Sequence, residues 1–129
     1  MSFNSFRQHL YRFFNRDEYE ESSRMQKTLN EKVLGLFHGY GGTKEFQGVE
    51  FFFYTDTRDK ANNLAIELSA MGYDVYGVSK DSDADKYSIT GCTMPVKMDE
   101  ESLTDWSKQM CKLGYDNDCQ FDGWGTLIE

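Results

Sequence analysis

The stretch "DSDADK" is the part of the sequence whose residue types and spacing come nearest to a metal site. Asp81, Asp83 and Asp85 follow the D-x-D-x-D spacing that opens an EF-hand calcium loop. That loop also requires glycine at its sixth position and glutamate at its twelfth, where this chain has Lys86 and Cys92. A specific calcium site is therefore not expected. The stretch is interpreted either as a solvated hairpin tip or as an acidic patch that faces basic residues of a partner.

A second acidic group, Asp99, Glu100 and Glu101, stands at the start of a predicted helix. Carboxylates at this place stabilise the positive end of the helix dipole, which is a sufficient structural reason for them. The same side chains could also extend an acidic face. These three residues and the three aspartates of the hairpin are the candidate partner-binding residues.

Nothing in the sequence has the spacing of a catalytic or cofactor site. The three cysteines, Cys92, Cys111 and Cys119, are widely spaced without a CxxC pair, and His9 and His38 stand alone. No GxSxG nucleophile motif occurs. We therefore predict a protein that is not an enzyme, holds no metal or cofactor and keeps its cysteines reduced in the cytoplasm.

Length and charge narrow the class of partner. The 129 residues suit one compact domain with a short N-terminal addition. The net charge of −8 arises wholly in residues 61–129, which hold 5 basic and 13 acidic side chains. Such a surface repels nucleic acid and favours a protein with a basic surface. The alternative is that the acidic surface only aids solubility. No apolar run is long enough for a membrane span, and no signal peptide is recognisable.

Hydrophobic periodicity becomes clear from Val49 onward. The run "VEFFFYT" is typical of a buried strand, and the helix after it, predicted to be capped by Asp56, carries an apolar stripe from Ala61 to Met71. Gly72 is predicted to end that helix. "YDVYGVS" then alternates as a strand does.

The second half repeats this order of elements. "YSITGCTMPV" is the next strand candidate, and it is followed by a helix that we expect Asp99 to cap and Gly114 to end. The buried stripe of this helix begins with Leu103 and Trp106. "CQFDGW" forms the last strand.

The resulting order β-α-β-β-α-β predicts a ferredoxin-like α+β fold with a four-stranded antiparallel sheet. Right-handed connections place the first and third strands in the middle and the last strand at an edge. This domain is predicted to cover residues 45–129. Residues 1–44 are predicted to form an N-terminal helical extension, in one or two pieces, with a glycine-rich linker. We expect its aromatic stretch, from Phe3 to Phe14, to pack as a helix on the sheet face that the two helices leave free. The alternatives are self-association and a basic amphipathic contact surface.

The chain closes with "FDGWGTLIE", in which Trp124 stands between two glycines. A tryptophan that docks an edge strand contributes several kcal/mol, since truncation of a buried Trp costs about 3–5 kcal/mol. Gly123 and Gly125 would allow the backbone to turn sharply beside it. We interpret the tetrapeptide Asp122-Gly123-Trp124-Gly125 as a structural clasp, and an exposed anchor for a partner is the alternative.

The aromatic strand, the helix that ends in "GY" and the closing "FDGWG" together resemble the family of regulator of ribonuclease activity B (RraB), over about residues 46–129. The resemblance implies a small acidic bacterial protein with a ferredoxin-like fold that binds and inhibits endoribonuclease E. The founding members continue beyond the tryptophan motif into a long acidic tail, whereas the present sequence stops at Glu129.

The preferred hypothesis is a non-catalytic, cytoplasmic protein-binding regulator, with a ribonuclease as the partner that the resemblance implies. One alternative is an immunity or antitoxin-like protein that neutralises a toxin. The other is a small-molecule-binding or catalytic domain that uses the sheet face. The sequence does not specify the oligomeric state.

Overall fold

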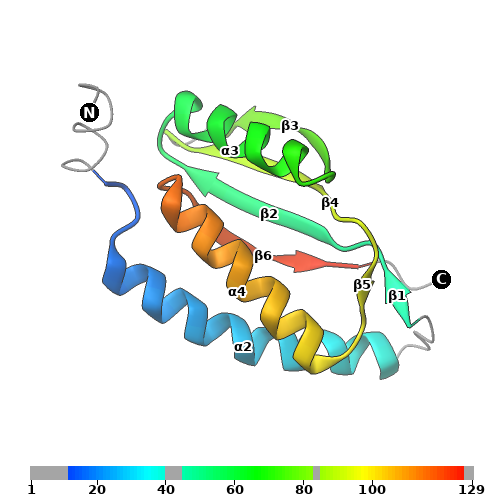
Figure 1. The fold of residues 1–129 in the computed structure, drawn as a ribbon. Coiled ribbons are helices and arrows are strands. Elements are labelled where there is room, and N and C mark those ends of the chain that lie inside the picture. Colours follow the sequence, from blue (N-terminus) through cyan, green and yellow to red (C-terminus); the bar gives the residue numbers. More distant parts are fainter. Residues whose placement is uncertain (1–11, 40–44, 83–84, 127–129) are drawn as a thin grey trace.

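The computed structural model describes residues 12–39, 45–82 and 85–126 (Figure 1). The β-α-β-β-α-β order that the hydrophobic pattern predicts from residue 49 onward is present, and the chain has one further helix and two further short strands among the described residues. The elements are α2 (Arg16–Gly39), β1 (Phe46–Gln47), β2 (Glu50–Thr55), α3 (Arg58–Ala70), β3 (Asp74–Lys80), β4 (Tyr87–Cys92), β5 (Val96–Lys97), α4 (Glu100–Asp116) and β6 (Gln120–Gly125).

The main sheet has four antiparallel strands in the order β3-β4-β2-β6. Its first and third strands along the chain, β2 and β4, lie in the middle, and the last strand, β6, lies at an edge. The ferredoxin-like α+β prediction is confirmed. A separate ladder of two residues in each strand pairs β1 with β5, and the sequence did not predict it.

Alternation along β2 explains how the sheet and helices pack. Phe51 and Phe53 are buried, while Phe52 between them is 38 % exposed. The buried rings face the layer of helices, where Leu64 of α3 and Leu103 of α4 belong to the same core cluster. The strand therefore has one dry face and one face open to solvent.

Helix α2 is one continuous helix that lies in the same layer as α3 and α4, beside α4 and the edge strand β6 (Figure 1). Helix α2 therefore does not cover the free sheet face. Its buried positions Asn30 and Phe37 explain why: Asn30 hydrogen-bonds to Ser107 of α4, and Phe37 enters the core cluster. Phe13, which precedes α2, does meet Tyr54 on the free sheet face, and the other aromatic residues of the N-terminal stretch, up to residue 11, lie outside the described residues. The division between residues 44 and 45 stays a prediction, and the glycines of the linker at 41 and 42 lie outside the described residues.

Two element boundaries differ from the prediction. Thr57, and not Asp56, caps α3, with its hydroxyl accepting from the Lys60 amide at 3.3 Å. Helix α4 continues past Gly114 to Asp116. A Cβ at Gly114 would lie 2.7 Å from the carbonyl oxygen of Cys119. Gly114 therefore lets the backbone at Cys119, just after the helix, pass close to α4, and it does not end the helix.

Within the described ranges, no helix has the combination of length and hydropathy that a membrane span requires.

Candidate functional site

The two acidic groups predicted to bind a partner lie at opposite ends of the sheet. The β3–β4 hairpin carries Asp81 and Asp85, both exposed, while Asp83 lies outside the described residues. Strand β4 leads away from this hairpin and continues through β5 to the start of α4 (Figure 1). The structure therefore separates Asp81 and Asp85 from the acidic start of α4, and these five described residues do not form one surface.

At the start of α4, the three carboxylates have different surroundings. Asp99 is the N-cap, accepting from the Ser102 amide at 2.7 Å, and it also forms an ion pair with Lys97 at 3.5 Å. The hydrogen bond from Ser102 and the nearby Lys97 lower the pKa of Asp99. Glu100 and Glu101 are exposed. Asp99 thus has a structural role already, whereas the binding role of all three stays a prediction.

Trp124 of the closing motif is 8 % exposed and joins three elements. Its indole nitrogen donates to Asn30 Oδ1 of α2 at 2.6 Å. Its ring meets that of Trp106 of α4 edge to face, with the centroids 6.5 Å apart. These contacts dock the edge strand β6 against both helices.

The two glycines of the motif are not equivalent. Strand β6 contains a bulge opposite Phe52 and Phe53, and Gly123 in this bulge has a φ of 116°. Side chains strain the backbone in that region, so Gly123 is required. Gly125 lies outside that region and has open space around it, and no close approach demands a glycine there.

Asp122 is the extra residue in the bulge, and its side chain is exposed. Partial desolvation raises its pKa, and the positive charge of Lys86 opposes this shift. Asp122 also acts with burial and Glu18 of α2 to raise the pKa of Tyr54. Asp122 and Glu18 both line a groove on the side of the molecule where β6 borders α2.

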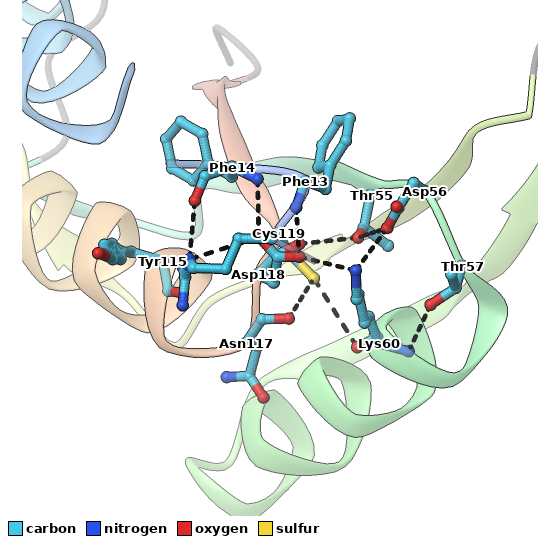
Figure 2. Close-up of polar contacts among 11 residues, drawn as sticks. Phe13, Phe14, Thr55, Asp56, Thr57, Lys60, Tyr115, Asn117, Asp118 and Cys119 are labelled. Carbon is cyan, nitrogen blue, oxygen red and sulfur yellow. Dashed lines mark hydrogen bonds and ion pairs between the residues drawn. The ribbon is translucent and has the colours of Figure 1, made fainter. Parts of the chain in front are cut away.

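The turn between α4 and β6 contains a second aspartate in a contrasting environment (Figure 2). Asp118 is 3 % exposed and has a φ of 54°. Its carboxylate accepts from the amides of Phe13 and Phe14 at 2.6 and 2.7 Å, and it pairs with Lys60 Nζ at 2.7 Å. Arg12 lies 3.8 Å from the same carboxylate. We call Arg12, Asp56, Lys60 and Asp118 the buried charge network, in which Lys60 and Asp118 are buried and Arg12 and Asp56 are partly exposed.

The network is internally satisfied. Lys60, which is 7 % exposed, also pairs with Asp56 at 2.8 Å. Burial alone lowers the pKa of Lys60, but the hydrogen bonds and charges of Asp118 and Asp56 outweigh it, so the pKa is raised. Lys60 is held as a cation by one carboxylate from the β2–α3 connection and one from the α4–β6 turn.

Cys119 follows the network and is buried as well. Desolvation raises the pKa of its thiol to about 12, so at neutral pH it is a poor nucleophile. Burial also raises the pKa of Cys111. Neither thiol has the lowered pKa of a catalytic cysteine.

The sequence analysis missed this network altogether. Its members are spread from Arg12 to Asp118, and only the fold brings them together. The one local signal is the polar run "DND" just before the buried Cys119.

On the open face of the sheet, exposed aromatic side chains lie among carboxylates. Phe52 is 38 % and Tyr76 is 58 % exposed, while Tyr54 donates a hydrogen bond to Gln120 and meets Phe13 edge to face. Across the described parts of the chain, no group of three or more His, Cys, Asp or Glu side chains has a metal-binding arrangement. The described surface thus offers carboxylates and apolar rings for contact with another macromolecule.

Comparison with known protein families shows to which family the chain belongs. The family model described as regulator of ribonuclease activity B matches residues 42–126. The chain belongs to the RraB family. No curated protein matches the chain.

RraB membership associates the chain with the regulation of ribonuclease activity. The matched residues contain the whole four-stranded sheet with α3 and α4, whereas α2 precedes them. Helix α2 is therefore a part of this molecule that the family match does not describe, although it packs on the Trp124 of the matched region.

Proposed function

We propose that this RraB-family protein is a non-catalytic regulator that binds a ribonuclease through an acidic surface and so lowers its activity. The observation that carries the proposal is the family match over residues 42–126, in a chain of net charge −8. The class of partner is a protein with a basic surface, and endoribonuclease E is the first candidate.

Electrostatics supports a protein partner in place of RNA. Lys and Arg contacts to phosphate dominate the affinity of proteins for nucleic acids, and a surface rich in carboxylates opposes such binding. The same carboxylates accelerate the encounter with a basic protein, because long-range attraction raises the association rate.

The absence of a catalytic role is part of the proposal. The buried charge network brings several titratable groups together, but its carboxylates and lysine are paired with each other. Asp118 and Lys60 are also nearly inaccessible, at 3 % and 7 % exposed. A substrate could not reach them without local unfolding.

The test is a binding and inhibition assay with purified endoribonuclease E from the same organism. We expect the protein to bind the nuclease and to slow cleavage of an RNA substrate. Binding should weaken as NaCl rises from 50 to 500 mM, since salt screens exposed charges beyond about 10 Å at 0.1 M. A protein that neither binds nor inhibits at low salt would refute the proposal, and RNA cleavage by the protein alone would refute its non-catalytic part.

A further inference from the structure

Strand β6 is a sheet edge with a groove along it. Among the described strands, β6 pairs only with β2, and α2 runs beside it in the same direction (Figure 1). A groove of about 340 Å³ lies between them, lined on the strand side by Gln120 and Asp122.

The groove has a distinct chemistry. Glu18 and Glu21 of α2 and Asp122 of β6 line it, are exposed, and have no salt bridge to any described Lys or Arg. Met25 and Leu29 of α2, which line the same groove, are 58 % and 42 % exposed. The groove thus combines exposed apolar side chains with carboxylates that have no salt-bridge partner among the described residues.

We infer that this groove, the α2–β6 groove, binds an extended basic segment of a partner protein, which adds as a strand to the free edge of β6. An edge strand offers main-chain donors and acceptors to a further strand. Side chains of an added strand alternate between two faces. Apolar ones can therefore cover Met25 and Leu29 while basic ones meet Glu18, Glu21 and Asp122.

The same features disfavour the other occupants. A nucleic acid backbone would bring phosphates against three carboxylates. A second copy of the chain, paired edge to edge through β6, would bring the same carboxylates against one another, and like charges in close apposition are unfavourable.

The inference rests on the proposed function for the identity of the partner, and it adds the location of the binding surface. One wall of the groove is α2, which precedes the residues that the family model matches. The binding surface therefore depends on a helix about which family membership says nothing.

A pair of charge-reversal variants tests the location. Glu18→Lys with Glu21→Lys changes the groove, and Glu31→Lys with Asp59→Lys is the matched control. Both pairs are exposed, lie on helices and alter the net charge equally, and neither Glu31 nor Asp59 lines the groove. We expect the groove pair to weaken binding of endoribonuclease E by at least about tenfold and the control pair by less than about threefold. Equal losses, or a larger loss in the control, would overturn the inference.

A second experiment does not depend on the nuclease. The probe is an acetylated eight-residue peptide of alternating Lys and Val, added to ¹⁵N-labelled protein and followed by amide chemical shifts. We expect shifts concentrated in β6 and the first half of α2, and weaker binding by a peptide with alternate backbone nitrogens methylated, since it lacks half of the strand donors. Three results would each refute the inference: amide shifts concentrated elsewhere, no shifts at millimolar peptide, or equal affinity of the methylated and unmethylated peptides.

The two experiments separate the possible failures. If the wild-type protein does not bind endoribonuclease E but the peptide shifts map to the groove, the proposed function fails and the groove stands. If the nuclease binds the wild-type protein and the groove pair does not weaken this binding, the inferred role of the groove is refuted and the proposed function stands. Light scattering that shows a dimer abolished by the groove pair would favour a second copy and overturn the inference.

Discussion

Asp118 and Asp122 lie four residues apart in one short segment, yet the fold treats them oppositely. Asp118 is 3 % exposed and has Lys60, Arg12 and two backbone amides around its carboxylate (Figure 2). Asp122 is exposed, has no salt bridge with the described residues, and has a raised pKa. The same type of side chain is buried in the core at position 118 and faces solvent at position 122.

The difference teaches where to look for function in an acidic protein. A buried, fully paired carboxylate cannot meet a partner, and its removal tests the fold. An exposed, unpaired carboxylate beside an apolar groove contributes little to the fold, and its removal tests binding. Five substitutions, one of them a control, test the segment from Asp118 to Gly125 and its contact with Arg12.

The largest effect is expected for Asp118→Asn. The variant keeps a side chain that tolerates the φ of 54° but leaves Lys60 with only Asp56 as a counter-charge. Loss of one partner from a buried ion pair costs about 3–5 kcal/mol, and we expect the lower end of this range because Asp56 remains. Urea unfolding followed by circular dichroism measures the change. A decrease in the free energy of unfolding of less than about 1 kcal/mol would mean that water reaches the network and replaces the lost ion pair.

Gly123→Ala should come next, with Gly125→Ala as its control. The alanine at 123 must adopt a φ of 116°, and such strain costs about 1–3 kcal/mol. At 125 the backbone is outside the glycine-only region and the space is open, so we expect a change within about 0.5 kcal/mol. Thermal unfolding of both variants checks the difference, and equal midpoints would show that the bulge relaxes.

A smaller loss is expected for Arg12→Gln, which alters the attachment of residues 12–14 to the network. The guanidinium lies 4.0 Å from the centre of the Tyr115 ring and 3.8 Å from Asp118. We expect about 1 kcal/mol, because the cation–π contact and part of the ion pair are lost while Lys60 still holds Asp118. Denaturant titration gives the value. A loss as large as that of Asp118→Asn would contradict the ranking.

Asp122→Asn should change stability least, by less than about 0.5 kcal/mol at pH 7. The folded-state pKa of Asp122 is raised above its ordinary value of 3.8. Its contribution to stability is therefore greatest below the unfolded pKa and is lost as pH rises through the folded pKa. The variant should equal or slightly exceed the wild type at pH 7, and this advantage should shrink toward pH 4. Parallel unfolding curves at the two pH values test the sign, and a growing advantage would refute it.

Local patterning was sufficient to predict most of the fold. The aromatic run of β2, the apolar stripes of α3 and α4 and the closing strand each carry their own period, and right-handed connections leave few ways to join them. Boundaries were less secure. Thr57 and Asp56 are adjacent potential caps, and only the position of Lys60 in the folded chain shows which one caps the helix and which one pairs.

The sequence by itself determined the β-α-β-β-α-β order, the acidic character of the second half and the RraB resemblance, because these depend on residues near one another or on composition alone. Only the tertiary structure decided that α2 lies beside α4, that Asp118 meets Arg12 and Lys60, and that Asp122 borders a groove with Glu18. The physical reason is that burial and ion pairing depend on contacts between residues tens of positions apart in the sequence. Hydrophobic periodicity reports only on residues a few positions apart and so cannot predict such contacts.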